Sequence, residues 1–301
     1  MISRKEWFVI CNPTSGNGRF KNKKEKLVKA LRGLKAGFQI AFTEHPHHEK
    51  KLVKQAINNG FINFISIGGD GTLHHLINGI FLQNTIAINQ ITIGVIPVGT
   101  GNDWVKHYRI PFYLKKNIAI LNKKNTHQQD IGKINLNGKD FFFNNGSGLG
   151  LDAFVVQNLN KKFGKLSYIF ASFKSVFKFN KSKIKYVCNN KEQMVNSLLM
   201  SIGICSYSGG GMQLTNKAIT NDGLFDVTVI HDLNPMALFF NVHRLYNGKL
   251  SKHKKVETFK TNKLEINILD KNTRIQADGE LLGSGKAIFE MLPNAINFVV
   301  P

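Results

Sequence analysis

The chain has 301 residues, enough for two ordinary domains, because a domain typically needs about 100 to 200 residues. Hydrophobic residues make up 42% of it, a globular fraction, and the longest apolar runs fall far short of the roughly 20 residues that a membrane-spanning helix needs. The net charge of +22, from 41 Lys+Arg against 19 Asp+Glu, predicts an anionic partner: nucleic acid, a membrane surface or a phosphorylated ligand.

The start of the chain and its three cysteines favour a reducing compartment. The first residues, MISRKEWFVICNP, contain no long apolar segment followed by small residues, so we expect neither a signal peptide nor a membrane anchor. Cys11, Cys188 and Cys205 are odd in number and lack metal-ligand spacing, which disfavours a disulfide framework and a zinc site. We therefore expect reduced cysteines and a cytoplasmic protein.

The first part of the chain alternates strand-like and helix-like segments. Strands are predicted at residues 6–10, 38–43, 61–67 and 91–98, and helices at 21–34, 49–60, 72–81 and 113–124. In the helix at 72–81, Leu73, Leu76, Ile77 and Ile80 share one face. Strands that alternate with helices indicate a parallel sheet with crossover helices, in a Rossmann-like α/β domain.

Short alternating segments separated by Gly, Asn and Asp turns fill the second part. They lie at 130–153, 182–192, 195–207, 224–232, 262–270, 273–282 and 295–300, with helix-like runs at 165–179 and 235–248. This texture predicts an antiparallel β-sandwich or barrel. We therefore expect an α/β domain at 1–128 and a β-rich domain at 129–301, with the extreme C-terminus free to pack back on the first domain.

Three glycine-containing loops follow predicted strands of the first part. They are CNPTSGNG at 11–18, GGDGT at 68–72 and PVGTGND at 97–103. In an open parallel sheet, loops at the carboxyl ends of the strands converge on one ligand site. Glycine lets backbone amides approach a ligand closely, and amides at a helix start bind phosphate. A single such loop would be an ordinary tight turn, but three of them predict one phosphate site.

Two acids, Asp70 and Asp103, lie inside these loops. The phosphate-loop pattern G-x-x-x-x-G-K-[ST] and the dinucleotide pattern G-x-G-x-x-G are both absent from the sequence, which disfavours the two common nucleotide-binding classes. Carboxylates beside phosphates repel them unless a divalent cation lies between. Mg²⁺ is the usual mediator, often held through water.

The motifs GGDGTLHHLINGI and IGVIPVGTGNDWVKHYRIP resemble the diacylglycerol kinase catalytic domain of the bacterial soluble lipid kinases, which are relatives of sphingosine kinases. NPTSG precedes them, and GKLSYIFASF, YSGGGMQL, KAITNDGLFDVTVI and ADGELL follow in the order and spacing of that family. The resemblance therefore spans nearly the whole chain. GGDG alone is shared with NAD kinases and phosphofructokinases, whereas PVGTGND combined with DGLFDV and DGE is specific.

The resemblance implies a two-domain kinase that binds ATP in a cleft between an α/β domain and a β-sandwich domain. Carried over by position, the nucleotide-binding residues are Asn12, Pro13, Thr14, Ser15, Gly16, Thr43, Gly69, Asp70, Gly71, Thr72, Leu73, His74, His75 and Thr100. Asp70 and Asp103 would help to organise Mg²⁺. Relatives usually carry Glu where this chain has His75.

The resemblance also implies a structural Mg²⁺ site in AITNDGLFD. There the side chain of Asp222 and the backbone carbonyls of Ile219 and Leu224 would be the ligands. The local sequence alone predicts something simpler, because NDG before a strand is also an ordinary hairpin turn.

In ADGEL, the family places its proposed general base at Asp278 or Glu280. A lipid hydroxyl is weakly acidic, so a carboxylate within hydrogen-bond reach can accept its proton as it attacks. We favour Glu280 as the base, with Asp278 close behind and Asp70 as a third candidate; the alternative is a solvated turn.

A basic and aromatic stretch spans residues 153–191, with nine lysines and no acidic residue. Such a stretch suits an anionic membrane surface and also single-stranded nucleic acid, while the apolar face of its helix-like part could equally pack on the core. We expect a lipid substrate at the inner membrane surface, to which the protein is peripheral, and no nucleic acid. The sequence leaves the oligomeric state open, a homodimer included.

The expectation is an ATP- and Mg²⁺-dependent lipid kinase, with diacylglycerol as the favoured acceptor and phosphatidic acid as the product. Two alternatives stay open. One is a kinase of a soluble acceptor such as NAD, which shares the GGDG loop. The other is a non-catalytic basic module that binds a membrane or nucleic acid, whose binding would not depend on Asp70 or Glu280.

Overall fold

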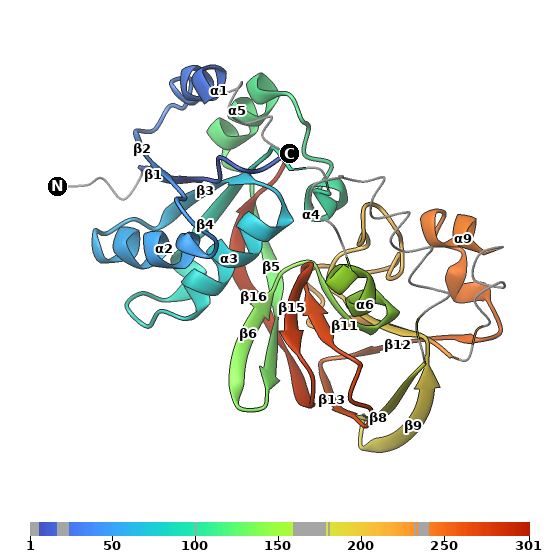
Figure 1. The fold of residues 1–301 in the computed structure, drawn as a ribbon. Helices are drawn as coiled ribbons and strands as arrows, with labels where there is room; N and C mark the ends of the chain where they lie inside the picture. Colours follow the sequence, from blue (N-terminus) through green and yellow to red (C-terminus); the bar gives the residue numbers. More distant parts are fainter. Residues whose placement is uncertain are drawn as a thin grey trace. The chain divides into compact units, whose positions relative to one another are not determined.

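The computed structural model describes residues 6–16, 24–99, 101–158, 179, 181–231, 233 and 241–301. The chain divides into two compact units (Figure 1). The first unit comprises Met1–Gln129 and Asn294–Pro301, and the second comprises Asp130–Pro293. Two strands, β5 (Thr126–Leu136) and β16 (Lys286–Val299), run from one unit into the other.

The first unit contains a parallel sheet with helices in sequence between its strands. Its elements are β1 (Trp7–Cys11), α1 (Lys24–Leu31), β2 (Phe38–Phe42), α2 (His48–Asn58), β3 (Asn63–Gly68), α3 (Asp70–Phe81), η2 (Ile88–Gln90), β4 (Thr92–Pro97), α4 (Asp103–His107) and α5 (Leu114–Lys123). The strands lie in the order β2-β1-β3-β4, all parallel, and the end of β16 adds to β4, also in parallel. The predicted α/β fold of this part is confirmed.

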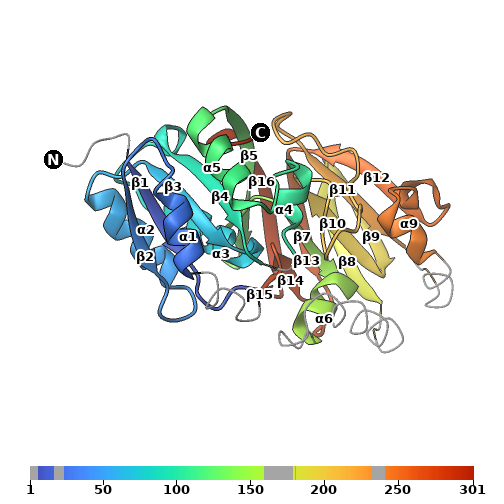
Figure 2. The ribbon, with the colours of Figure 1, turned by 90° about the horizontal axis from the view of Figure 1, so that it is seen from above.

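Alternation along the strands explains the two layers of helices. Trp7, Val9 and Cys11 of β1 join a buried cluster with residues of α1 and α5 on one face of the sheet. Phe8 alternates with these residues in the same strand, and its ring centroid lies 5.2 Å from that of Phe61, which follows α2. Figure 1 shows α1 and α5 on one side of the sheet and α2 and α3 on the other, and Figure 2 looks onto the sheet from the side of α1 and α5. β1, β3 and β4 are therefore buried on both faces, which accounts for their nearly continuous apolar sequences, whereas β2 lies at the sheet edge and is only half-buried.

Helix α3 begins directly at the glycine loop after β3. Its predicted apolar face is confirmed: Leu73, Leu76, Ile77 and Ile80 are all buried. α3 packs against α2 and β3. Helical spacing of apolar residues gives one buried stripe, so the start of α3 is fixed beside the sheet edge where the strand-end loops lie.

The second unit is a β-sandwich. Its elements are most of β5 and β16, β6 (Lys139–Phe143), β7 (Gly146–Gly150), α6 (Leu151–Asn158), β8 (Ser182–Cys188), β9 (Lys191–Ser197), β10 (Leu199–Gly203), β11 (Phe225–Ile230), α9 (Val242–Tyr246), η4 (Leu250–Lys252), β12 (Val256–Thr261), β13 (Lys263–Ile268), β14 (Ile275–Ala277) and β15 (Glu280–Gly283). One sheet has the order β12-β11-β10-β7-β14-β15, and the other contains β16-β13-β8-β9 with β5 and β6. One buried cluster takes side chains from both sheets, so the predicted sandwich is confirmed.

Several elements differ from the prediction. The sequence pattern missed β12, the first part of β16 and α4, and it treated the first three residues of α6 as part of a β-rich segment. The predicted helix at 165–179 lies almost wholly outside the described residues, and of the one at 235–248 the described part contains α9. Within the described ranges, no helix has the length and hydrophobicity needed to cross a membrane. The three cysteines are free thiols. Burial raises the pKa of the Cys11 thiol to about 12, which makes it a packing residue.

Candidate functional site

The strand-end loops of the first unit are bonded to one another. The backbone N–H of Asn12 donates to Ile67 O at 3.0 Å, which ties the loop after β1 to the end of β3. The N–H of Val98 donates to Gly68 O at 2.8 Å, which ties the loop after β4 to the same strand end. The three glycine loops therefore converge, as adjacent parallel strands require.

The loop after β1 is held in a tight turn by its own asparagine. Asn12 Oδ1 accepts hydrogen bonds from Thr14 N at 3.0 Å and from Thr14 Oγ1 at 2.8 Å. Asparagine side chains commonly mimic a backbone turn in this way. Gly16 has a φ of 70°, in the left-handed region. Buried Thr43 joins the loop, since its N–H donates to Cys11 O at 2.9 Å. This geometry exposes Thr14 and leaves Pro13 and Ser15 partly accessible.

Glycine is required where the second and third loops meet. A Cβ atom on Gly99 would lie 2.5 Å from the Cα of Gly69, a backbone atom that cannot rotate away. A Cβ on Gly101 would lie 2.8 Å from Asp70 Oδ2. The two loops thus pack backbone against backbone, around one carboxylate. Thr100, between these glycines, lies outside the described residues.

Asp70 begins helix α3, and Asp103 begins helix α4. The N-cap of α3 is Gly69, which provides no side-chain cap. The N–H of Asp103 donates to Asp70 Oδ2 at 3.2 Å, so the two predicted acids are brought together. The Asp103 carboxylate is buried and pairs with Lys106 Nζ at 2.5 Å, whereas Asp70 remains partly accessible. Asp70 is therefore the acid that can meet a ligand, and Asp103 positions it.

The next turn of α3 carries two histidines with different partners. His74 is buried, and its Nε2 lies 3.3 Å from the side-chain nitrogen Nδ2 of Asn78. His75 Nε2 lies 3.1 Å from His47 Nδ1, at the start of α2, and the tautomers decide which nitrogen donates. His75 thus forms an imidazole pair at the position where the resemblance implies a Glu. Gly71, Thr72 and Leu73 form the first turn before it, with Thr72 and Leu73 buried.

In the second unit, Asp278 serves as an acceptor for backbone amides. Its Oδ1 accepts from Asn145 N at 3.0 Å and Gly146 N at 3.1 Å, and its Oδ2 accepts from Asn144 N at 3.1 Å. Three N–H groups on one carboxylate form a strong, charge-assisted cluster. Asp278 therefore fixes the backbone before β7. This structural role occupies both oxygens that a base would need.

Glu280 lies on the other side of the same hairpin turn. Asp278 and Gly279 have φ values of 48° and 84°, and Ala277 pairs with Glu280 across the turn, so the two carboxylates diverge. Gly279 N donates to Gln276 Oε1 at 2.8 Å, which fixes the turn from inside. Glu280 is partly exposed at the start of β15. Of the two acids, Glu280 has the geometry of a candidate base.

Asp222 is paired with a lysine that the sequence analysis did not single out. Its Oδ1 accepts from Leu224 N at 3.1 Å, and its Oδ2 lies 2.7 Å from Lys260 Nζ, which also lies 3.0 Å from Asp226 Oδ2. Partial burial lowers the pKa of Lys260, but hydrogen bonds to both acids outweigh it and raise the pKa overall. Burial raises the pKa of Asp226 against the opposing effect of Lys260.

A further acid, Asp130, supports the same loop. It is fully buried, its Oδ2 accepts from Gly223 N at 2.7 Å, and its N–H donates to Thr220 O at 2.7 Å. Of the partners described above, only Lys106 could have been predicted from sequence, because it lies three residues after Asp103 on one helix. The contacts of Asp130 and Lys260 join distant segments, so no local signal marks them.

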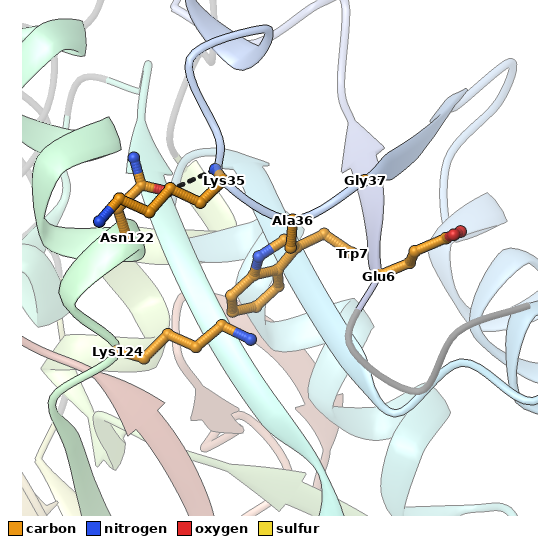
Figure 3. Close-up of a pocket in the computed structure, with 7 residues that line it drawn as sticks. All are labelled: Glu6, Trp7, Lys35, Ala36, Gly37, Asn122 and Lys124. Atoms are coloured by element: carbon orange, nitrogen blue, oxygen red, sulfur yellow. Dashed lines mark hydrogen bonds between the residues drawn. The ribbon is translucent and has the colours of Figure 1, made fainter.

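A cavity of about 380 Å³ lies at the opposite edge of the first unit's sheet (Figure 3). Its lining residues are Glu6, Trp7, Lys35, Ala36, Gly37, Asn122 and Lys124. These residues lie at the starts of β1 and β2 and at the end of α5, whereas the glycine loops follow the strand ends. The cavity is therefore separate from the candidate phosphate site.

Two family models cover most of the chain. The diacylglycerol kinase catalytic domain matches residues 6–134, and the YegS C-terminal NAD kinase beta sandwich-like domain matches residues 147–300. The chain belongs to the bacterial diacylglycerol kinase-like family of lipid kinases. Membership implies that this kinase uses ATP.

Relatives of this lipid kinase match along almost their full length. Diacylglycerol kinase of Staphylococcus aureus strain bovine RF122 is 27% identical over 304 residues, covering 99% of this chain and 93% of the relative. Diacylglycerol kinase of Bacillus subtilis strain 168 is 26% identical over 301 residues, covering 97% and 95%. A crystal structure of a diacylglycerol kinase from Bacillus anthracis strain Sterne has a TM-score of 0.75 at 18% identity, covering 99% of this chain and 97% of that one. That likeness supports the same fold.

The site residues of this lipid kinase fit ATP better than they fit the implied structural metal. The uncapped start of α3, the close glycine loops and accessible Asp70 suit phosphates with an associated Mg²⁺. At Asp222, by contrast, one oxygen faces a backbone amide and the other faces the Lys260 ammonium. Because both Asp222 oxygens already have partners within the chain, Asp222 with Ile219 and Leu224 does not fit the expected Mg²⁺ site. Among the described residues, no group of three or more His, Cys, Asp or Glu side chains could hold a metal ion elsewhere.

Proposed function

We propose that this protein transfers the γ-phosphate of ATP to the hydroxyl of diacylglycerol, giving phosphatidic acid, at an anionic membrane surface inside the cell. The observation that carries the proposal is the Asp103 N–H bound to Asp70 between two glycine loops that pack backbone to backbone. Relatives named diacylglycerol kinase over nearly the whole chain support this acceptor.

Each unit has a distinct task in the proposed reaction. Phosphoryl transfer depends mainly on positioning and on charge stabilisation, which backbone amides at the start of α3 and around Asn12 supply. When bound with ATP, Mg²⁺ neutralises charge on the phosphates. Glu280 accepts the proton of the lipid hydroxyl as that oxygen bonds to the γ-phosphorus and the bond from the γ-phosphorus to the bridging oxygen of ADP breaks. Asp278 holds the segment before β7 in place.

The test incubates purified protein with labelled ATP, Mg²⁺ and separate acceptors: diacylglycerol, ceramide, a sphingoid base, phosphatidylglycerol and NAD. We expect label in phosphatidic acid. In Asp70→Ala, we expect transfer to disappear while vesicle binding stays unchanged and the protein stays folded, with a melting temperature lower by only a few degrees because the Asp103 N–H loses its acceptor. If another lipid were labelled instead, that lipid would replace diacylglycerol as the proposed acceptor. Label in no acceptor, with intact vesicle binding, would favour a non-catalytic module.

A soluble acceptor is the second candidate function. It is favoured by one observation, the likeness of residues 147–300 to a domain described as NAD kinase beta sandwich-like. The same assay decides between the two, because label in NAD and in no lipid would replace our first choice.

A further inference from the structure

Two neighbouring aromatic side chains protrude from the first unit. Phe112 is 59% exposed and Tyr113 is 73% exposed, in the turn between α4 and α5. We call this pair the aromatic tip. Large apolar side chains exposed singly are ordinary on protein surfaces, but adjacent ones at the apex of a turn suggest a contact surface.

The backbone of the aromatic tip is held firmly by buried residues. Ile110 is buried, and its N–H donates to Val105 O at 3.0 Å. Buried Asn117 donates through Nδ2 to Pro111 O at 2.6 Å and through its N–H to Tyr113 O at 3.0 Å. The turn is therefore anchored on both sides, and its conformation directs the two aromatic side chains into solvent.

The surroundings of the aromatic tip are strongly basic. Residues 104–129 contain six Lys or Arg and no Asp or Glu. Arg109, Lys115 and Lys116 flank the tip and are exposed, and Lys116 Nζ lies 5.7 Å from the Tyr113 ring centroid. Helix α1 packs against α5 and carries the exposed cations Lys24, Lys26 and Lys29 beside one exposed acid, Glu25. Exposed Arg32 and Lys35 follow the end of α1. This face therefore attracts anions.

We propose that the aromatic tip inserts into the headgroup region of an anionic bilayer while the flanking cations bind lipid phosphates. The proposal rests on the proposed function and names the surface by which the kinase reaches its lipid. Aromatic rings favour the membrane–water interface, and basic residues beside them add attraction to anionic lipids. By chain length, Phe112 lies within roughly 25 Å of Asp103, close enough for membrane docking to serve the phosphate loops. Single-stranded nucleic acid is less well matched, since it binds aromatics spaced along a groove.

The test measures sedimentation of the full-length protein with vesicles of phosphatidylcholine, alone or mixed with phosphatidylglycerol. We expect wild type to bind only the anionic vesicles, and the Phe112→Ser/Tyr113→Ser double variant to bind them roughly tenfold more weakly or worse. Leu82→Ser is the matched control, because Leu82 is 56% exposed elsewhere in the first unit and should leave binding unchanged. Equal melting temperatures would exclude misfolding. Unchanged vesicle binding by the double variant would overturn the proposal.

A parallel activity assay separates this proposal from the proposed function. With vesicle diacylglycerol, the double variant should lose activity, and with a water-soluble short-chain diacylglycerol it should retain it. If vesicle binding depends on the aromatic tip but no lipid is phosphorylated, the docking surface would be supported and the proposed kinase activity contradicted. Loss of oligonucleotide binding with intact vesicle binding would instead assign the tip to nucleic acid.

A second inference comes from the ion pair at Asp222 and is independent of the first. The register of β11 and β12 sets Asp226 directly opposite Lys260, and Asp222 precedes β11 in the adjoining loop. One ammonium thus lies within 3.0 Å of both carboxylates, while Asp130 and Asp222 hold the loop through Gly223 N and Leu224 N.

We infer that the Lys260 ammonium takes the place of the structural Mg²⁺ implied by the resemblance, because it neutralises the carboxylates of Asp222 and Asp226. A fixed ammonium neutralises the acid pair and ties the loop to β12, so this loop should need no divalent ion. The folded chain would then not depend on a divalent ion at this loop for its stability. A divalent ion could bind only after the lysine was displaced or removed.

The test compares melting temperatures without nucleotide, in chelator and in about 10 mM Mg²⁺. Wild type should change by less than about 1 °C, whereas Lys260→Met should melt lower in chelator and recover by about 3 °C or more with Mg²⁺. Lys263→Met is the matched control, because Lys263 is more exposed and lies 3.7 Å from Glu265. The Lys260→Met/Asp222→Asn variant should lose the Mg²⁺ response. A wild-type melting temperature that rises with Mg²⁺, or a Lys260→Met variant that ignores it, would contradict the inference.

Discussion

Asp278 and Glu280 lie two residues apart in one hairpin, and their surroundings separate their roles. Asp278 accepts three backbone N–H groups from residues 144–146 through both of its oxygens. Glu280 lies beyond the turn, where the chain direction has reversed. Asp278 therefore holds three backbone groups through both of its oxygens, whereas Glu280 lies outside that cluster.

This difference predicts opposite effects of two isosteric substitutions. Asp278→Asn removes the charge from the three bonds, so we expect about 1 to 3 kcal/mol of lost unfolding free energy. Glu280→Gln should leave the melting temperature unchanged and lower kcat by roughly 10²- to 10⁴-fold, the usual contribution of a positioned base. Thermal unfolding and steady-state kinetics on both variants provide the measurement. A normally stable but inactive Asp278→Asn variant would move the base to Asp278.

Among the elements, the two glycine loops depend most closely on each other. A methyl group on Gly99 would meet the backbone of Gly69 at 2.5 Å, so Gly99→Ala must force the loops apart. We expect at least roughly tenfold weaker binding of a non-hydrolysable ATP analogue, because the amides around the phosphate would move. Titration with a fluorescent analogue would measure this.

Gly37→Ala is the matched control for the loop experiment. Gly37 lies at the opposite edge of the sheet, and its added methyl group would meet only the flexible side chain of Glu6, at 3.1 Å. Nucleotide affinity should therefore stay at the wild-type value. Equal losses in Gly37→Ala and Gly99→Ala would show a general effect on the first unit and contradict the proposed loop geometry.

Helix α6 packs against β14 in the second unit and contributes a buried acid, Asp152, to that contact. Asp152 is buried, and its Oδ2 accepts from Gln276 Nε2 at 2.7 Å. Burial raises the pKa of Asp152 to about 6, against the opposing hydrogen bond from Gln276. The folded pKa exceeds the unfolded value, so folding favours the protonated form, and the free energy of unfolding should fall as pH rises from about 4 to about 6.

Asp152→Asn should remove that pH dependence. Above pH 6 we expect the variant to be more stable than wild type by up to about 3 kcal/mol, because no charge is buried, and below about pH 4 the difference should vanish. Urea unfolding of both proteins from pH 4 to 8 would measure the difference. A constant difference across this range would show that the carboxylate stays ionised in the folded protein.

The elements that sequence predicted best are those buried on both faces or along a full helical stripe. β1, β3, β4 and the apolar face of α3 are buried in this way, so their types followed from local pattern, and the half-buried edge strand β2 was predicted as well. β12 did not, since it is an edge strand whose residues are mostly half-buried or exposed. The glycine loops and Asp70 were marked by composition. Lys260 and the partners of Asp278 were not, because β-strand register and a loop more than 130 residues away create those contacts.

At the scale of the whole molecule, each unit has its own core. One buried cluster joins β1, β3, α1 and α5 with Val299, the last residue of β16, and a second joins the two sheets of the sandwich. Units with separate cores can open separately, so a ligand bound to one should stabilise that one. This allows the nucleotide site to be assigned without any measurement of activity.

Hydrogen exchange with and without a non-hydrolysable ATP analogue tests that assignment. At a concentration 100 times its Kd, the analogue stabilises the binding unit by about 2.7 kcal/mol, so core amides of β1 and β3 should exchange roughly 100-fold more slowly. Amides of β10 and β11, in the second unit, should keep their rates. Asp70→Ala, at the same analogue concentration, should show no slowing. Slowing confined to β10 and β11 would place the nucleotide in the second unit, and equal slowing everywhere would mean that the two cores unfold together.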